Sequence, residues 1–224
     1  MFIDKSMTKD VLTVRPDTGI PEAHAIMAQN RIRHLPVVGE DNTLLGIVTD
    51  RDIRSAMPSS LLPETEQTAE KKQISTLKVK EIMTPNPVTV SPLQTLEDAI
   101  ILMQKTKVGA FPVVDEEGKL RGIISIRDLL RAFVNVLGLE EPGALIGIIV
   151  EDKIGQMKRV VDAITEQGVS FGSILVARYW EEGKRAVFPY LLTNNILRVR
   201  KRLIELGFTL LDPMEWSLDQ LPKR

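Results

Sequence analysis

Two matched pairs of polar side chains are the groups in this sequence best suited to bind a ligand. In each pair a hydroxyl is followed three residues later by a carboxylate, as Thr49 is by Asp52 and Ser125 is by Asp128. A carboxylate can accept hydrogen bonds from two vicinal hydroxyl groups, and such charge-assisted bonds are strong. The threonine or serine can bond to the sugar or phosphate edge of the same molecule. Because small apolar residues surround each pair, we predict a ligand with an apolar ring and a polyol, a description that adenosine phosphates fit.

A structural role for the two aspartates is the alternative, since turn aspartates often cap or brace helices. In the first pair, Asp50 is the better candidate for the N-cap of the helix that follows, which would leave Asp52 free. The pattern also occurs twice, and a purely structural turn does not need the same two groups at both places. We therefore favour ligand binding for Asp52 and Asp128.

The two pairs lie in two copies of one unit, and a repeat of this kind governs how the rest of the chain is interpreted. Residues match without a gap at an offset of 76, so that Asp52 corresponds to Asp128. Identical residues also occur at further matched positions: Met7-Thr8 with Met83-Thr84, Thr13-Val14 with Thr89-Val90, Pro16 with Pro92, Ala23 with Ala99, Met27 with Met103, and Pro36-Val37-Val38 with Pro112-Val113-Val114.

Hydrophobic periodicity predicts the order strand, helix, strand, strand, helix in each copy. The second copy repeats this order from residue 88 to about 138, and its last helix, over 127–139, has an apolar side. In the first copy the elements are a strand over 11–14, a helix over 20–30, strands over 35–38 and 44–48, and a helix from 51 to about 57.

The repeated unit resembles a known family. Met-Thr near the start of the unit, Pro-Val-Val on a strand, and Gly-Ile-Ile/Val-Ser/Thr-x-x-Asp at the end are similar to the CBS-domain pair, or Bateman module, over residues 1–137. The resemblance implies an α/β (α+β) fold in which two βαββα repeats pack as one module. It also implies binding of AMP, ADP, ATP or another adenosine derivative, no required cofactor, and assembly as a homodimer.

The resemblance places further residues around the two hydroxyl–carboxylate pairs. Arg51 and Arg127 lie beside helix N-terminal amides, which suit an anion. The adenine is expected against Val37, Val48, Val113 and Ile124 and against the backbone near Thr13 and Thr89.

The two copies differ just before the Pro-Val-Val strand, where CBS pairs commonly supply cationic contacts to phosphate. The first copy has Arg33 and His34 there, whereas the second has Gly109 and Ala110. We therefore predict that one site prefers charged nucleotides and that the other is weaker or takes a less charged ligand. The alternative interpretation is that Arg33 and His34 are solvated residues before an edge strand.

A third part follows the two copies, with the order strand, helix, strand, strand, helix, strand, which implies a ferredoxin-like sandwich. The first strand is expected over 144–150, and a hairpin joins 169–180 to 184–192. Pro189 predicts that the second arm is an edge strand or carries a bulge. Asn194 or Asn195 is expected to cap the second helix.

This third part is similar to an ACT domain, because Gly155 lies between its first strand and helix. ACT domains often carry Asp-x-Pro-Gly at this loop, and here Ile154 takes the place of the proline. Asp152 and Gly155 are the residues of a possible ligand loop. A CBS pair followed by an ACT-like domain, at this length, resembles the acetoin-utilisation AcuB-type proteins.

The composition excludes several classes of site. The sequence has no cysteine and two histidines, so a thiol nucleophile and a zinc site of cysteine and histidine are excluded. We predict no catalytic residues, no metal and no enzyme. The net charge of −1 gives no indication of nucleic acid, and the basic run over 198–202 is interpreted as a solvated helix face. Without a signal-peptide core or a membrane-spanning run, we expect a cytoplasmic protein with no membrane partner.

We therefore predict a regulatory protein in which the CBS pair senses an adenosine derivative. Its last helix, over 127–139, would relay occupancy to the ACT-like domain or to an unknown protein target. One alternative is a ligand-free scaffold for dimerisation, and another is an amino-acid sensor that uses the ACT-like domain. The predicted segments are CBS repeat 1 (1–57), a mobile connector (58–77), CBS repeat 2 (78–139), a linker (140–143), the ACT-like domain (144–212) and a C-terminal tail (213–224).

Overall fold

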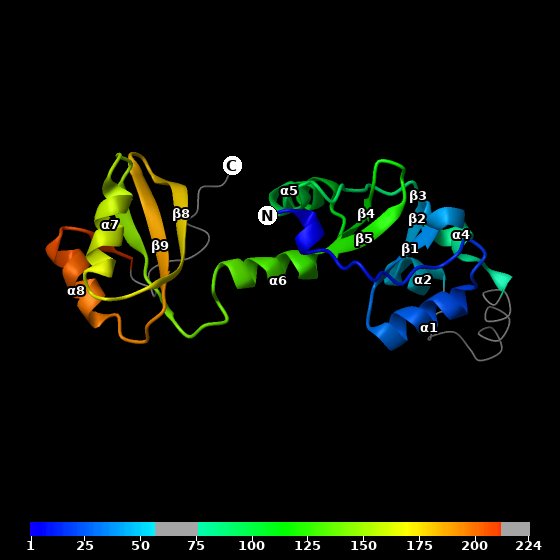
Figure 1. Cartoon of the computed structure of the whole chain (residues 1–224), viewed down its shortest axis with the longest axis horizontal. Coiled ribbons are helices and arrows are strands. Elements are labelled where there is room, and N and C mark those ends of the chain that lie inside the picture. Colours follow the sequence, from blue (N-terminus) through cyan, green and yellow to red (C-terminus); the bar gives the residue numbers. More distant parts are fainter. Residues whose placement is uncertain (57–75, 212–224) are drawn as a thin grey trace. The chain divides into compact units, whose positions relative to one another are not determined.

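The computed structural model describes residues 1–56 and 76–211 and divides the chain into two compact units, Met1–Leu130 and Arg131–Arg224 (Figure 1). Both units mix helices and strands. No helix within the described ranges is long and apolar enough to cross a membrane. Most of the predicted connector, residues 58–75, and the predicted tail over 213–224 lie outside the described residues.

The first repeat begins with a single bridge where a strand over 11–14 was expected, so that expectation is wrong. Val14 pairs in parallel with Val37 only, and Pro16, which has no N–H and a fixed φ, follows closely. The other predicted elements are present. They are helix α1 (Ile20–Asn30), strand β1 (His34–Val38), the 3₁₀ turn η2 (Glu40–Asn42), strand β2 (Leu44–Thr49) and helix α2 (Asp50–Ala56).

The second repeat has the same order, and Val90 makes the corresponding parallel bridge to Val113. Its last helix ends at Val136, before the predicted residue 139, and Gly138 then turns the chain with φ of +67°. The elements are helix α5 (Leu96–Thr106), strand β4 (Ala110–Val114), strand β5 (Leu120–Ser125) and helix α6 (Ile126–Val136).

The two Met-Thr segments are exchanged between the repeats. Thr8 and Ile123 form an antiparallel bridge, with an N–H···O bond of 3.0 Å in each direction. The 3₁₀ turn η1 (Ile3–Lys5), which precedes Thr8, lies beside the second repeat in Figure 1. Conversely, helix α4 (Val79–Ile82) packs in the core of the first repeat, and strand β3 (Thr84–Pro85) pairs with β2. Each repeat is therefore completed by a segment that precedes the other repeat in sequence.

Each repeat buries one face of its helices against its hairpin. In the first repeat Ile20, Ala23 and Met27 of α1 pack with the strand residues and with Val79. In the second repeat Leu96, Ala99 and Met103 of α5 are the buried residues at the matched positions. Burying such side chains stabilises the fold by about 1.5–3 kcal/mol each for the larger ones, which fixes the strand ends that carry the polar pairs.

The second unit contains one antiparallel sheet with strand order β10–β7–β9–β8. The predicted strand over 144–150 is divided into β6 and β7, both of which pair with β9. Gly147 lies at the division, where a Cβ would approach the Leu211 side chain to 2.8 Å. The strands are β6 (Ala144–Leu145), β7 (Ile148–Glu151), β8 (Phe171–Glu181), β9 (Lys184–Leu191) and β10 (Thr209–Leu210).

Pro189 lies on the central strand, so the first alternative, an edge strand, is wrong. The second alternative was a bulge, and the β8–β9 ladder does shift register close to Pro189, between Phe171 and Ser173 of β8. Pro189 pairs with Ile174 of β8 on one side, and on the other side it faces the division between β6 and β7. There its carbonyl accepts a hydrogen bond from Ile146 N–H at 3.2 Å. The broken neighbour strand accommodates a residue that cannot donate to a ladder.

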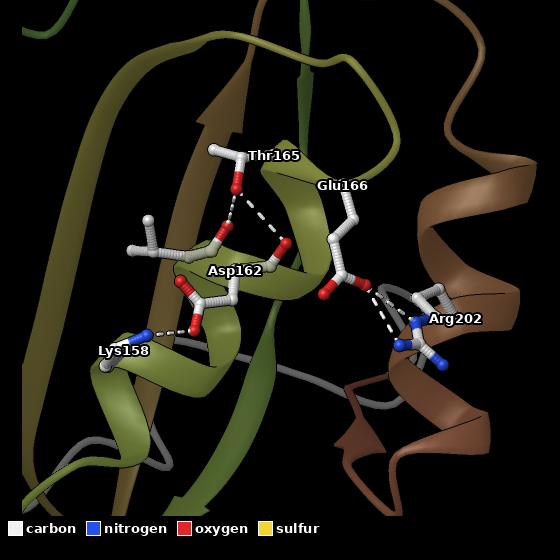
Figure 2. Close-up of polar contacts among 6 residues, drawn as sticks. Lys158, Asp162, Thr165, Glu166 and Arg202 are labelled. Carbon is white, nitrogen blue, oxygen red and sulfur yellow. Dashed lines mark hydrogen bonds and ion pairs between the residues drawn. The ribbon is translucent and has the colours of Figure 1, made fainter.

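Helices α7 (Gln156–Thr165) and α8 (Leu197–Glu205) cover one face of this sheet, packing on Ile148, Val150 and Val187. The expectation that Asn194 or Asn195 caps α8 is wrong, because the N-cap is Ile196, which makes no side-chain capping bond; Asn195, one residue earlier, accepts from Leu197 N–H at 3.3 Å. Figure 2 shows that Glu166 and Arg202 join the two helices. Arg202 Nε and Nη2 both donate to Glu166 Oε2, at 3.1 and 2.9 Å.

Candidate functional site

The first hydroxyl–carboxylate pair is closed upon itself by hydrogen bonds. Asp52 Oδ2 accepts from Thr49 N–H at 2.8 Å and from Thr49 Oγ1 at 2.7 Å. Asp52 N–H donates in return to Thr49 Oγ1 at 3.3 Å. This reciprocal pattern is a capping box, in which Thr49 is the N-cap of α2. The expectation that Asp50 caps the helix is therefore wrong, because the helix begins at Asp50 itself.

The second pair has the same geometry. Asp128 Oδ2 accepts from Ser125 N–H at 2.9 Å and from Ser125 Oγ at 2.7 Å, and Asp128 N–H donates to Ser125 Oγ at 3.4 Å. Asp128 is 7% exposed, whereas Asp52 is half-buried. The repeat thus carries one arrangement twice, at the end of β2 and at the end of β5.

Another capping box in the chain serves as an internal comparison. Thr95 and Asp98, at the start of α5, make the same three contacts at 2.7, 3.0 and 3.1 Å, and Asp98 is exposed. The hydrogen bonds of the two pairs are thus those of ordinary helix caps. Capping uses only Oδ2 of Asp52, and Oδ1 accepts no hydrogen bond from any residue in the described ranges. That oxygen retains the capacity to accept from a ligand hydroxyl.

The apolar residues expected against an adenine ring are all 0% exposed and belong to the cores of the two repeats. These residues are Val37, Val48, Val113 and Ile124. In the first repeat, Val37 and Val48 pack in the same cluster of buried apolar side chains. The contact of all four residues with an adenine ring stays a prediction. Thr13 and Thr89 remain half-buried, each next to the valine that bridges to its repeat's hairpin.

His34 lies where the two repeats meet. Its ring is against Gly109 of the second repeat, with Nε2 3.7 Å from the position of a Cβ at Gly109. Burial lowers the pKa of His34, the adjacent Arg33 charge lowers it further, and the Asp52 carboxylate opposes both effects. The imidazole is therefore close enough to the Asp52 carboxylate to interact with its charge, and it lies against Gly109 in the matching loop of the other repeat.

Two of the predicted cationic residues meet in one hollow of about 340 Å³. Arg33 comes from the loop before β1, and Arg127 comes from the first turn of α6 in the other repeat. Arg31 and His24, which the sequence-based site did not include, also line it. Arg51, the counterpart of Arg127, is exposed on α2 and is not among the lining residues.

The two residues of the possible ligand loop in the second unit have separate surroundings. Asp152 is ion-paired with Arg185 and lines a hollow of about 510 Å³ with it. Gly155 is exposed, adopts φ of +91° at the N-cap of α7, and does not line that hollow. Within the described residues, no three histidine, aspartate or glutamate side chains are grouped to hold a metal.

The sequence matches the family model of the CBS domain twice, over residues 3–59 and 79–135. A CBS domain-containing protein of Dictyostelium discoideum is 39% identical over 138 residues, which are 61% of this chain and 94% of that protein. Inosine-5′-monophosphate dehydrogenase of Aquifex aeolicus is 30% identical over 196 residues, which cover 76% of this chain but only 37% of the dehydrogenase.

Two solved structures are each similar to part of the chain. CBSX2 of Arabidopsis thaliana in complex with AMP has a TM-score of 0.51 and 30% identity, over 59% of this chain and 96% of that chain. An acetoin utilization protein (AcuB) from Vibrio cholerae has a TM-score of 0.52 and 29% identity, over 63% and 98%. Both alignments cover about three-fifths of this chain.

Proposed function

The chain belongs to the CBS domain family, and we propose that its CBS pair senses AMP or another adenosine derivative in a regulatory, non-catalytic role. The hydroxyl–carboxylate pairs, Thr49 with Asp52 and Ser125 with Asp128, would hold the ribose at the ends of β2 and β5. Ligand binding can regulate only through different affinities for two states, and such couplings are typically about 1–3 kcal/mol.

One observation carries this proposal. Oδ1 of Asp52 accepts no hydrogen bond from residues 1–56 or 76–211, and the carboxylate lies in the first turn of α2, near His34. A carboxylate oxygen in that position can accept from a ribose hydroxyl without giving up its cap. The similar CBSX2 structure contains AMP, which makes an adenine nucleotide the first ligand to test.

The two sites would not be equivalent. Arg33 and His34 supply a cation and a titratable group in the first repeat, while Gly109 and Ala110 occupy the matched positions. Because His34 lies against Gly109, we place it between the two sites and expect it to affect both. A charged nucleotide would then prefer the side of the module that carries Arg33.

The second unit would receive the signal. Its order strand, helix, strand, strand, helix, strand, with sheet order β10–β7–β9–β8 and both helices on one face, supports a ferredoxin-like, ACT-like domain. Helix α6, which spans the limit between the two units, would relay occupancy. A homodimer and a separate protein target are further parts of the proposal, and a link to acetoin metabolism rests on similarity to AcuB alone.

A ligand-free scaffold is the second candidate, favoured by the comparison with Thr95 and Asp98. If capping explains all three boxes, the two repeats need no ligand. An amino-acid sensor is less well supported, since Gly155 does not line the hollow that Asp152 lines with Arg185.

Thermal unfolding of the full chain with AMP, ADP, ATP, NAD, S-adenosylmethionine and amino acids, each added separately, tests these alternatives. A ligand at 100 times its dissociation constant stabilises the native state by about 2.7 kcal/mol, which shifts the melting temperature clearly. A shift with an adenine compound supports the sensor. A shift with an amino acid alone would transfer the role to the second unit, and no shift with any compound would favour the scaffold.

A further inference from the structure

We propose that the end of α6 is anchored on the sheet of the second unit and that this anchor makes strands β8 and β9 respond to changes at the first turn of α6. The anchor consists of four residues: Gly138, Glu141, Gly172 and Tyr190. All four belong to the second unit. The inference rests on the proposed function only for the ligand that starts the change, and the anchor itself is tested without that ligand.

The end of α6 has a single defined geometry. Gly138 adopts φ of +67°, and its N–H donates to the Asn135 carbonyl at 3.2 Å. Leu139 N–H donates to the Val134 carbonyl at 3.1 Å, which completes the Schellman pattern of a helix end. Glu141 N–H then donates to the Gly138 carbonyl at 3.2 Å. The chain therefore leaves α6 through a hydrogen-bonded turn.

Two glycines let this turn lie directly against β8. A Cβ added at Gly138 would be 3.2 Å from the Gly172 Cα atom. A Cβ added at Gly172 would be 3.4 Å from the Leu137 carbonyl oxygen and 2.8 Å from Cδ1 of Tyr190. Gly172 lies at the register shift of the β8–β9 ladder. The backbone after α6 and the backbone of β8 are thus in contact, with no room for a side chain between them.

Tyr190 of β9 holds the residues that follow. Its hydroxyl donates to the Glu141 carbonyl at 2.7 Å. A Cβ added at Gly143 would be 2.8 Å from Cζ of the same ring. Strand β6 begins directly afterwards and pairs with β9. The residues predicted as a linker, 140–143, are therefore bound to the sheet along their length.

The first turn of α6 is held equally firmly by the first unit. Asp128 is buried and forms the capping box with Ser125 at the end of β5. Between the two ends, Ile126–Val136 contains neither glycine nor proline, and the limit between the units falls inside this helix. Rigid helices and packed backbone are the elements through which coupling travels in proteins. A change at Asp128 therefore reaches β8 and β9 without a flexible segment to absorb it.

Hydrogen–deuterium exchange of the full chain, with and without AMP, tests the proposal. We expect AMP to slow amide exchange over β9, Lys184–Leu191, because a stabilised α6 leaves the anchored strands less free to open. This effect should disappear in Gly138→Ala. In Tyr190→Phe, the milder variant, which removes only the bond to Glu141, it should become about two-fold smaller.

Gly168→Ala is the matched control for Gly138→Ala. Gly168 follows α7 in the same unit and adopts φ of +70°, but a Cβ there would meet nothing within 4 Å. The two variants therefore share the backbone strain, and only Gly138→Ala disturbs the anchor. Persistence of the AMP effect on β9 in Gly138→Ala, or an equal loss in Gly168→Ala, would overturn the proposal.

Calorimetric titration of AMP separates this inference from the proposed function. If AMP binds but leaves exchange over β9 unchanged in the unmodified chain, the anchor proposal fails and the nucleotide site remains. If AMP does not bind, Asp128→Ala supplies the change at the start of α6. The anchor predicts faster exchange over β9 in Asp128→Ala, and no such increase when Asp128→Ala is added to Gly138→Ala. An increase confined to the first turn of α6 would contradict it.

Discussion

Thr8 is hydrogen-bonded to Ile123 through both of its backbone groups, at 3.0 Å each, although the two residues belong to different copies of the repeat. Thr84 pairs with Ile47 in the corresponding place. Each repeat therefore depends on a segment at the start of the other, which makes the two repeats one cooperative unit rather than two independent domains.

Replacing Gly122 by alanine should disrupt this exchanged contact. A Cβ at Gly122 would lie 2.6 Å from Met7 Sδ and 2.9 Å from the Thr8 carbonyl oxygen, and the backbone oxygen cannot move without breaking the bridge. We expect a loss of about 1–3 kcal/mol in the free energy of unfolding, measured by chemical denaturation.

Gly109→Ala is the matched control for Gly122→Ala, since its Cβ would meet nothing closer than His34 at 3.7 Å. That variant should be neutral or slightly stabilising, because alanine restricts the unfolded chain. Equal stability of both variants would contradict the importance of the exchanged segment.

His34 should make the stability of the chain depend on pH. Burial and Arg33 lower its pKa in the folded state below its ordinary value of about 6.5, so the unfolded chain binds the proton more readily. The free energy of unfolding should therefore fall as pH drops from about 6.5 toward the lowered pKa. His34→Gln should remove this component of the pH dependence, measured by denaturation at a series of pH values.

A titration followed by NMR checks the cause of that shift. The His34 resonance should titrate below the ordinary pKa of histidine, and Arg33→Gln should raise its midpoint by removing the neighbouring charge. A His34 pKa at or above 6.5 in the unmodified chain would refute this account of its surroundings.

Glu166 and Arg202 should stabilise the packing of α7 on α8 by a small amount. Both side chains are partly exposed, so a double-mutant cycle should give a coupling below about 1 kcal/mol. Lys158 and Asp162, also drawn in Figure 2, form an ion pair within α7 alone and provide the comparison. A coupling of zero for Glu166 and Arg202 would show that this ion pair does not help to hold the two helices together.

The sequence predicted the elements of the repeats well because a 76-residue match reports the same local structure twice. It did not reveal the exchange, since the pattern around Met7 and Met83 is identical whichever repeat each segment joins. The Asp50 cap was wrong for a local reason: Thr49 and Asp52 bond to each other and move the start of α2 by one residue.

The site was only partly predictable for reasons of burial and tertiary contact. Alternation places Val37 and Val48 on a strand but does not say that α1 and α4 cover them completely. Arg33 and Arg127 were each expected near an anion, but their meeting in one hollow depends on how the repeats pack. The edge-strand alternative for Pro189 was wrong because only the sheet order shows that its neighbour strand is divided.

The central claim is that Asp52 and Asp128 bind a ligand in addition to capping helices. Asp52→Ala, Asp128→Ala and Asp98→Ala each remove the carboxylate from a capping box of the same geometry, at the start of a different helix. Each variant should therefore lose about 1 kcal/mol of stability. Titrating AMP calorimetrically into these three variants and the unmodified chain separates the two roles. We predict that Asp98→Ala binds AMP like the unmodified chain and that at least one of the other two variants loses a binding site. Unchanged AMP binding in both Asp52→Ala and Asp128→Ala would contradict the account.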